Sequence, residues 1–553
     1  MAFLAFVVVI FTFIHYYYFQ MYGNKIDIFI FGLKDDDTNA ILSIIFADYS
    51  VVKILIFSVL FGIFCFWLNA KIMRLKFYPV KLPMVLLICL NVVLVYLYVV
   101  ALRGHFTYNA LRASSYEFST TKAFNEISTN PVIAFLWVHQ EYKESLKLPK
   151  IPSGAIESLE QKLFSIFDTT KSHKNHAKYH IYVNLMESFG LNILEFSNEK
   201  HNFLGRLQRH FEEDFLWRRF LSSGNSTIGS LNQLAFLSPN LVSNGLHQKQ
   251  VLSFTPLQLY KNAGYEIIFV YSGNASWYNL GNYFKLQGAD KVIDENSLMQ
   301  GFPHSRATKH KYGIADEFMY EKIYSLFKNA KKPTSVLSLS ISTHRPYIHK
   351  SKENLFDENA LEASFLEKFI VENPKDALKT YAYANDEFGK FLDKIKGDAL
   401  GDKIIIAATG DHRFRDLKMD SNFERAFAYS VPFYLYLPQN LRDGLYYDKN
   451  RVGSHKDIFP TLYALSLSEV KYLSLGGRDM LAKPKDTKKE FGFNARVWID
   501  ENGVYSGDRA YYFKHQDSLK NTEESFEPSA YHKNFAKAYK ELNSYQLIER
   551  LGT

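Results

Sequence analysis

The stretch at residues 180–188 reads HIYVNLMES, seven mostly apolar residues that run directly into a carboxylate and a hydroxyl. A short apolar run of this length, rich in Ile, Val and Tyr, is typical of a strand buried on both faces. In α/β proteins the ligands gather at the carboxyl ends of such strands. Glu187 and Ser188, which follow the run, are therefore candidate site residues.

Four further apolar runs follow and alternate with amphipathic segments: Glu266–Tyr271, Ser335–Ser340, Lys403–Ala408 and Val431–Leu437. This alternation predicts an α/β fold with a mostly parallel sheet flanked by helices. After about Gly492 the pattern changes to short segments that predict a strand meander followed by a helix: Val497–Asp500, Gly503–Ser506, Tyr511–Lys514 and Tyr531–Leu551.

The chain before Arg103 contains three long apolar runs: Ala2–Phe19, Val51–Leu68 and Leu82–Leu102. Each is long enough to cross about 30 Å of hydrocarbon. The first has no basic start and ends in aromatic residues rather than at a small-residue cleavage site, so we interpret it as a spanning helix and not a signal peptide. We therefore expect a multi-pass membrane protein with at least three spans.

The loops between the spans predict the orientation of the chain. The loop between the second and third spans carries Lys71, Arg74, Lys76 and Lys81 without an acid, whereas Asp27 and Asp35–Asp37 follow the first span. By the positive-inside rule the basic loop is cytoplasmic. The rest of the chain then lies on the periplasmic or extracellular face of a bacterial inner membrane.

The expected organisation has four parts: a transmembrane region over 1–104, a helical stem over 105–176 with a helix at Pro131–Ser145, a catalytic domain over 177–490 and a C-terminal extension over 491–553 packed on it. Cys65 and Cys89 both fall in expected spans, so the exported part has no cysteine for a disulfide. The net charge of +8 is dispersed, which argues against nucleic acid as a partner.

Polar residues follow two more of the expected strands. Thr409–His412 follow the run that ends at Ala408, and Ser342–Pro346 follow the run that ends at Ser340. Two carboxylates and an imidazole from neighbouring strand ends could bind one divalent ion and leave a position open for a nucleophile. Taken singly, Glu187 would more commonly be an ordinary strand-end carboxylate.

The sequence resembles the lipoteichoic acid synthase and phosphoglycerol transferase branch of the alkaline phosphatase and sulfatase superfamily, from about His180 to Leu465. Met186–Ser188 resemble the family's first strand end, where the glutamate binds metal. Gly224–Gly229 resemble the Gly-rich turn that carries the nucleophile, which would be Thr227. The resemblance implies a sulfatase-like fold with metal ligands Glu187, Thr227, Asp411 and His412.

The physical chemistry of a helix start agrees with Thr227 as the nucleophile. Backbone N–H groups at a helix N-terminus attract phosphate, and a metal on the hydroxyl would lower its pKa. Ser226 is the competing hydroxyl, and without the resemblance the pair would be read as a helix N-cap.

The resemblance also implies residues that contact the substrate. His344 matches a histidine that contacts the transferred phosphate and can protonate the leaving oxygen. Trp277 lies in a segment that resembles the head-group pocket, but Asn279 stands where the family commonly has an arginine. Further expected contacts are Arg345, Arg413, which could replace that missing charge, and His455 as an outer-site residue.

The expected activity is metal-dependent transfer of phosphoglycerol from phosphatidylglycerol, through a phospho-threonine, to an envelope glycan or polymer. Manganese is the expected cofactor, with Zn²⁺ and Mg²⁺ left open. A phosphoethanolamine transferase is the nearest alternative, although that branch usually carries several disulfides. A sulfatase activity would need a Cys/Ser-x-Pro-x-Arg segment, which the sequence lacks. A non-catalytic envelope protein is a third reading.

Overall fold

The computed structural model describes residues 2–22, 50–74, 83–103, 128–145, 165–171, 178–238, 250–349, 353–419, 422–506 and 509–539, except 199 and 537, and the isolated positions 26, 30, 241 and 351. The chain divides into two units. The first is Met1–Lys147 with Asn244–Leu246, and the second is Leu148–Ser243 with His247–Thr553.

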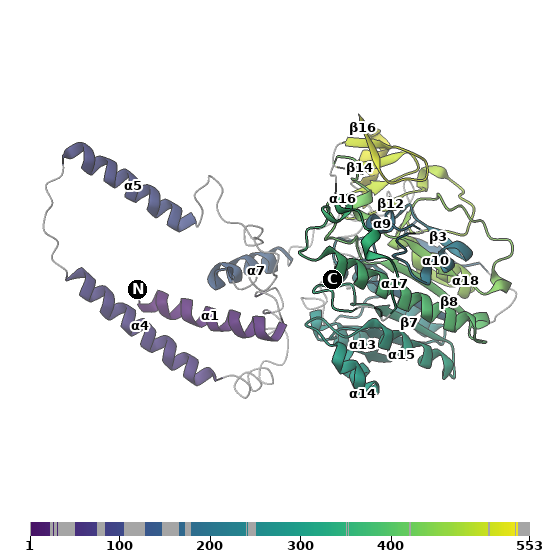
Figure 1. Ribbon diagram of the computed structural model, residues 1–553, viewed down its shortest axis with the longest axis horizontal. Helices are drawn as coiled ribbons and strands as arrows, with labels where there is room; N and C mark the ends of the chain where they lie inside the picture. Colours follow the sequence, from purple (N-terminus) through teal and green to yellow (C-terminus); the bar gives the residue numbers. More distant parts are fainter. Residues whose placement is uncertain are drawn as a thin grey trace. The chain divides into compact units, whose positions relative to one another are not determined.

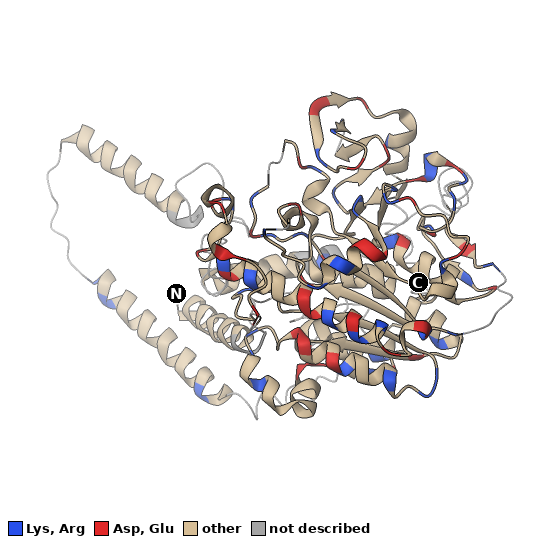
Figure 2. Ribbon diagram, turned by 45° about the vertical axis from the view of Figure 1, so that its right-hand side comes forward, with Lys and Arg blue, Asp and Glu red and all other residues tan. Residues whose placement is uncertain are grey.

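The first unit is helical (Figure 1), with α1 (Ala2–Tyr22), α4 (Val51–Met73), α5 (Met84–Arg103) and α7 (Pro131–Ser145). Charged residues are sparse on α1, α4 and α5 (Figure 2). Two helices, over Ala2–Phe19 and Val51–Met73, are long and apolar enough to cross a membrane, whereas the apolar part of α5, Met84–Val100, is shorter. Two of the three expected spans are thus confirmed as candidate membrane helices.

Aromatic side chains join the helices of this unit. Phe13 of α1 lies edge-on to Phe57 of α4, with ring centroids 6.0 Å apart, and Phe11 packs on Phe135 of α7 at 4.8 Å. The expected stem helix at Pro131–Ser145 therefore packs against α1. Most of the charged loop residues that predict the orientation, including Asp27, Lys76 and Lys81, lie outside the described residues.

A seven-stranded sheet forms the centre of the second unit (Figure 1), in the order β3-β9-β8-β2-β7-β5-β6. The five strands from β8 to β6 are parallel to one another, and at one edge β9 is antiparallel to both β8 and β3. The α/β class and the mostly parallel sheet are confirmed. The strands are β2 (His180–Met186), β3 (Phe215–Trp217), β5 (Glu266–Tyr271), β6 (Lys291–Ile293), β7 (Thr334–Leu339), β8 (Ile404–Gly410) and β9 (Phe433–Tyr436).

Helices cover both faces of this sheet, because alternate residues of each strand enter two separate cores. Tyr182 and Ile406 face the core that holds α10, α15 and α17, whereas Ile181 and Val183 face the core that holds α11, α12, α13 and α18. Strands apolar on both faces produce this arrangement. The helices are α9 (Leu191–Leu194), α10 (Leu207–Glu213), α11 (Thr227–Phe236), α12 (Pro256–Asn262), α13 (Leu280–Leu286), α14 (Glu295–Gly301), α15 (Asp316–Lys328), α16 (Ala363–Leu366), α17 (Pro374–Lys396) and α18 (His455–Ser466).

The C-terminal part forms a separate antiparallel sheet of five strands in sequence order: β12 (Gly492–Phe493), β13 (Trp498–Ile499), β14 (Gly503–Ser506), β15 (Arg509–Phe513) and β16 (Asn521–Phe526). Its aromatic core includes Leu237 and Leu473 from the preceding chain. Residues 530–536 begin the expected terminal helix, and most of its remainder lies outside the described residues. Two short pairs complete the strands: β1 (Phe167–Thr169) with β11 (Lys471–Leu473), and β4 (Phe220–Leu221) with β10 (Gly453–Ser454).

Candidate metal and phosphoryl-transfer site

The sheet order brings three polar strand ends together. β2 lies between β8 and β7 and ends at Glu187, while Asp411 and His412 follow β8 and His344 follows β7. All three strands are parallel, so their carboxyl ends share one edge of the sheet. Residues more than 200 positions apart in the sequence therefore meet at one place.

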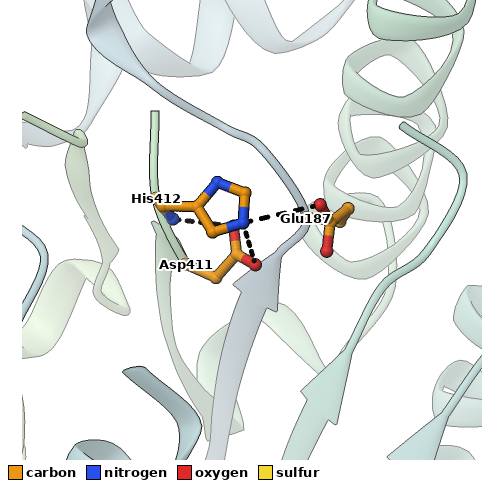
Figure 3. A group of neighbouring side chains, drawn as sticks. All are labelled: Glu187, Asp411 and His412. Atoms are coloured by element: carbon orange, nitrogen blue, oxygen red, sulfur yellow. Dashed lines mark hydrogen bonds and ion pairs between the residues drawn. The ribbon is translucent and has the colours of Figure 1, made fainter. Parts of the chain in front are cut away.

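Glu187, Asp411 and His412 are buried, and their ligand atoms all lie within 4.8 Å of one another. Figure 3 shows the imidazole and the two carboxylates converging: His412 Nε2 is 3.2 Å from Asp411 Oδ2 and 3.7 Å from Glu187 Oε1. Two carboxylates and one imidazole are a donor set suited to a divalent cation.

Backbone groups fix the orientation of these side chains. The N–H groups of Ser188 and His412 each donate to Asp411 Oδ1 at 2.7 Å, and the His412 Nδ1 contacts the Arg413 carbonyl at 2.8 Å. A carbonyl can only accept, so His412 carries its proton on Nδ1 and directs the Nε2 lone pair toward the carboxylates. Ser188 has φ of +55°, a strained conformation for a non-glycine residue that turns its N–H toward Asp411.

The electrostatics of the cluster favour a bound cation. Burial and the neighbouring Asp411 raise the pKa of Glu187, and burial likewise raises the pKa of Asp411. Burial lowers the pKa of His412 to about 4, so its imidazole is neutral at pH 7. Two buried carboxylates with a neutral imidazole carry charge that a cation would compensate.

The surroundings of one carboxylate oxygen indicate whether the cluster fits a metal ion. Asp411 Oδ2 is buried and has no hydrogen-bond partner among the residues that the structure describes. Buried carboxylate oxygens are normally paired, so an unpaired one that faces a neutral imidazole fits a metal ligand. Glu187, Asp411 and His412 would hold the ion.

Thr227 is the first residue of α11, and its hydroxyl lies 3.3 Å from Glu187 Oε2. Ser226 is the N-cap, and its Oγ accepts the Gly229 N–H at 3.2 Å. The competing hydroxyl is thus used in capping, whereas the Thr227 hydroxyl faces the cluster. A nucleophile at this place would have the helix N-terminus beside it.

The Sulfatase family model matches residues 180–466, just over half of the chain. The chain belongs to the Sulfatase family. The matched segment begins with β2 and ends with α18, so it contains the whole cluster.

Two curated proteins of Bacillus subtilis are similar to this family member. Lipoteichoic acid synthase 2 is 20% identical over 331 residues, which are 56% of this chain and 48% of that protein. The lipoteichoic acid synthase-like YvgJ is 20% identical over 230 residues, 39% of this chain and 35% of that protein. The chain spans less than half the length of these relatives.

Solved structures show the same fold. A protein of the alkaline phosphatase superfamily from Vibrio parahaemolyticus aligns with a TM-score of 0.54 at 18% identity, covering 73% of this chain and 97% of that one. The lipoteichoic acid synthase LtaP from Listeria monocytogenes aligns with a TM-score of 0.51 at 17% identity, covering 69% and 95%. The resemblance stated from the sequence is confirmed.

His344 and Arg345 follow β7 at the same sheet edge. The His344 Nδ1 contacts the Arg345 carbonyl at 3.1 Å, and its ring packs in a tilted arrangement against Tyr312 with centroids 3.8 Å apart. The Arg345 guanidinium forms a two-point ion pair with the buried Asp416, to which the Tyr347 hydroxyl also donates. Arg345, expected to bind substrate, is thus engaged in joining the loops after β7 and β8.

Trp277 and Asn279 lie in a short turn of 3-10 helix after β5, one strand beyond β7. Trp277 is half-buried and packs edge-on to Tyr278. Asn279 has φ of +52°, which asparagine tolerates, and its Oδ1 accepts from Asn282 Nδ2 at 2.8 Å. A long side chain at position 279 would lack this local amide contact.

Arg413 and His455 are both directed at the backbone. Arg413 Nη1 donates to the carbonyls of Phe414 at 3.2 Å and Leu417 at 3.0 Å within its own loop. The His455 Nδ1 accepts the Ser223 N–H at 3.3 Å, and its Nε2 lies 3.0 Å from the Gly410 carbonyl. Both ring nitrogens of the buried His455 are therefore occupied by backbone groups.

Two residues of the site, Asp416 and Arg415, did not stand out in the sequence. Asp416 pairs with Arg345, and the Arg415 guanidinium donates to the carbonyl of Asn225, two residues before Thr227. The only local signal is the run DHRFRD at 411–416, in which charged residues continue beyond the expected metal pair.

Proposed function

We propose that the chain is a membrane-anchored, metal-dependent transferase that moves phosphoglycerol from phosphatidylglycerol to an envelope glycan or polymer. One observation carries the proposal: the Thr227 hydroxyl lies at a helix N-terminus, 3.3 Å from a carboxylate of the Glu187, Asp411 and His412 cluster. A hydroxyl, a metal ligand set and an anion-binding helix end together favour a nucleophile for phosphate chemistry.

In the proposed first step Thr227 Oγ forms a bond to the donor phosphorus, and the bond from phosphorus to the diacylglycerol oxygen breaks. The Thr227 proton leaves through Glu187, whose Oε2 already accepts from this hydroxyl. His344 donates a proton to the departing oxygen. An acceptor hydroxyl then attacks the phosphorus of the phospho-threonine and gives its proton to His344. The bond from phosphorus to Thr227 Oγ breaks, and Glu187 returns the proton to Thr227, which completes the transfer.

A bound divalent ion would stabilise negative charge on the phosphate and favour the ionised Thr227 hydroxyl. We propose manganese, held by Glu187, Thr227, Asp411 and His412, and Zn²⁺ and Mg²⁺ suit the same donors. Trp277 and Asn279 are the proposed head-group contacts, because they lie beyond the neighbouring strand at the same sheet edge.

The membrane placement is part of the proposal. The two apolar helices over Ala2–Phe19 and Val51–Met73 would hold the enzyme at the bilayer, close to its lipid donor. The catalytic unit would then face the periplasm or cell exterior, where envelope acceptors are assembled. Relatives named as lipoteichoic acid synthases support a polymer acceptor.

The test is the intact mass of the full chain in detergent after incubation with Mn²⁺ and phosphatidylglycerol. We expect the wild type to gain the mass of one glycerol phosphate and Thr227→Ala to gain none. Ser226→Ala is the matched control, because this hydroxyl caps α11, and it should still form the adduct.

A parallel incubation with phosphatidylethanolamine separates the nearest alternative. An adduct of ethanolamine phosphate in place of glycerol phosphate would make the chain a phosphoethanolamine transferase. An adduct that persists in Thr227→Ala would exclude Thr227 as the nucleophile.

A further inference from the structure

The run Asp411–Asp416 directs its charged side chains to different places. Asp411 joins the metal cluster, Arg413 donates to carbonyls of its own loop, and Asp416 pairs with Arg345. Arg415 is the remaining charge. Its side chain is exposed, and its guanidinium reaches the Asn225 carbonyl, 190 residues away in the sequence.

This contact places a cation beside the proposed nucleophile. Asn225 precedes Thr227 by two residues, so the carbonyl that accepts from Arg415 lies within about 7 Å of the Thr227 backbone along the chain. The loop that carries Asn225 is held by Asn494, whose Nδ2 donates to the Ser222 carbonyl at 2.6 Å. The guanidinium therefore contacts a loop that a second side chain also holds.

The charge of Arg415 has no counter-charge in the part of the chain that the structure describes. No carboxylate there forms an ion pair with it, whereas Arg345, Arg451 and Arg478 are each paired with an acid.

A guanidinium has five N–H donors, and the described residues accept from Arg415 only through the Asn225 carbonyl. The remaining donors suit phosphate oxygens and the hydroxyls of a polyol. The same charge repels an ammonium group held near the guanidinium. Specificity of this kind arises as much from repulsion of the wrong ligand as from attraction of the right one.

We propose that Arg415 is a specificity-determining residue that selects phosphoesters with a neutral, hydroxyl-bearing head group over those with a cationic one. This inference rests on the proposed phosphotransferase function and assigns its head-group class. Arg415 lies in the loop after β8 and would supply the positive charge that is absent at Asn279.

Binding of two soluble probes tests the proposal without turnover. The full chain in detergent with Mn²⁺ is titrated with sn-glycerol 3-phosphate and with phosphoethanolamine, and the ratio of the two dissociation constants is measured. One unit charge at about 4 Å in water changes affinity roughly fivefold. We expect the wild type to prefer glycerol phosphate by about that factor, Arg415→Gln to abolish the preference and Arg415→Glu to reverse it.

Lys418→Gln is the matched control, because Lys418 is an exposed cation of the same loop that donates to the Glu367 carbonyl. It should leave the ratio unchanged. Equal weakening of both probes in Arg415→Gln would reduce Arg415 to a tether for the nucleophile loop and overturn the proposal, as would a wild type without preference. Thermal unfolding of each variant identifies loss of fold.

The adduct test of Thr227 and this binding test fail separately. A charge-dependent ratio without any Thr227 adduct would keep the Arg415 assignment and reject the transfer mechanism. A Thr227 adduct together with a ratio that is unchanged in the Arg415 variants would keep the transfer mechanism and reject the Arg415 assignment.

Discussion

At the scale of single residues, the ion pair of Asp416 with Arg345 is the contact that most directly supports the site. Asp416 is buried and accepts from Arg345 Nε at 2.8 Å, from the second guanidinium nitrogen and from the Tyr347 hydroxyl. It follows β8, whereas its two donors follow β7. The pair therefore joins the loop that carries His344 to the loop that carries His412.

Asp416→Asn should lower the free energy of unfolding by about 2 kcal/mol, because a hydrogen bond to a charged group contributes about that much. Thermal unfolding of the full chain in detergent measures the change. Arg345→Gln and the double variant complete a cycle, in which we expect the two substitutions to be strongly non-additive. Additive effects would mean that Arg345 does not depend on Asp416 and is available to a substrate.

At the scale of elements, the first residue of α18 is fastened to the last residue of β8. His455 is buried and reaches the Gly410 carbonyl at 3.0 Å, directly before Asp411. Gly410 is required here, since a Cβ would lie 2.1 Å from the Phe189 carbonyl oxygen. The strand end that presents Asp411 is thus held by a helix on one side and by the chain after β2 on the other.

This contact predicts how stability depends on pH. Burial lowers the pKa of His455 to about 3, so below its ordinary pKa of 6.5 the unfolded chain takes up a proton that the folded chain does not. Stability from this residue is complete above pH 6.5 and is lost as the pH falls toward 3. Between pH 6.5 and 5 the loss is about 2 kcal/mol.

His455→Gln keeps an N–H donor and removes the titration, so the variant should lose less stability than the wild type between pH 6.5 and 5. Thermal unfolding at a series of pH values measures the difference. His515→Gln, at an exposed position, should have the slope of the wild type. A slope unchanged in His455→Gln would show that this histidine is protonated without cost in the folded chain.

At the scale of the whole molecule, folding assembles the cluster from distant parts of the sequence. Glu187 and Asp411 meet only when β2 and β8 pair, so the unfolded chain does not present the site. A metal that binds only the folded chain raises its stability, by about 2.7 kcal/mol at a concentration 100 times the dissociation constant.

Mn²⁺ should therefore raise the unfolding temperature of the wild type, and EDTA should reverse the rise. Glu187→Gln should abolish the effect, while Glu523→Gln, at an exposed position of the C-terminal sheet, should retain it. Without metal, Glu187→Gln should be at least as stable as the wild type, because burial beside Asp411 raises the pKa of Glu187. A rise of equal size in Glu187→Gln would place the bound metal elsewhere.

Local sequence patterns were sufficient to predict the strands, the helices and the types of residue at the site. The runs at His180–Met186 and Glu266–Tyr271 match β2 and β5 residue for residue, and the expected helix at Pro131–Ser145 matches α7. These predictions are correct because the spacing of apolar residues over a few neighbouring positions shows which face of a strand or helix is buried. The family resemblance added which strand-end residues to consider together.

Contacts between segments that are distant in the sequence determine which partners these residues have. The order β8-β2-β7 brings Glu187 beside Asp411, and the packing of loops gives Arg345 to Asp416, His455 to the backbone and Arg415 to the loop before Thr227. Arg413 and Arg415 lie two residues apart and have the same side chain, but Arg413 donates to carbonyls of its own loop and Arg415 to a carbonyl 190 residues away. This difference depends on contacts across the fold, and the local periodicity of the sequence does not report such contacts.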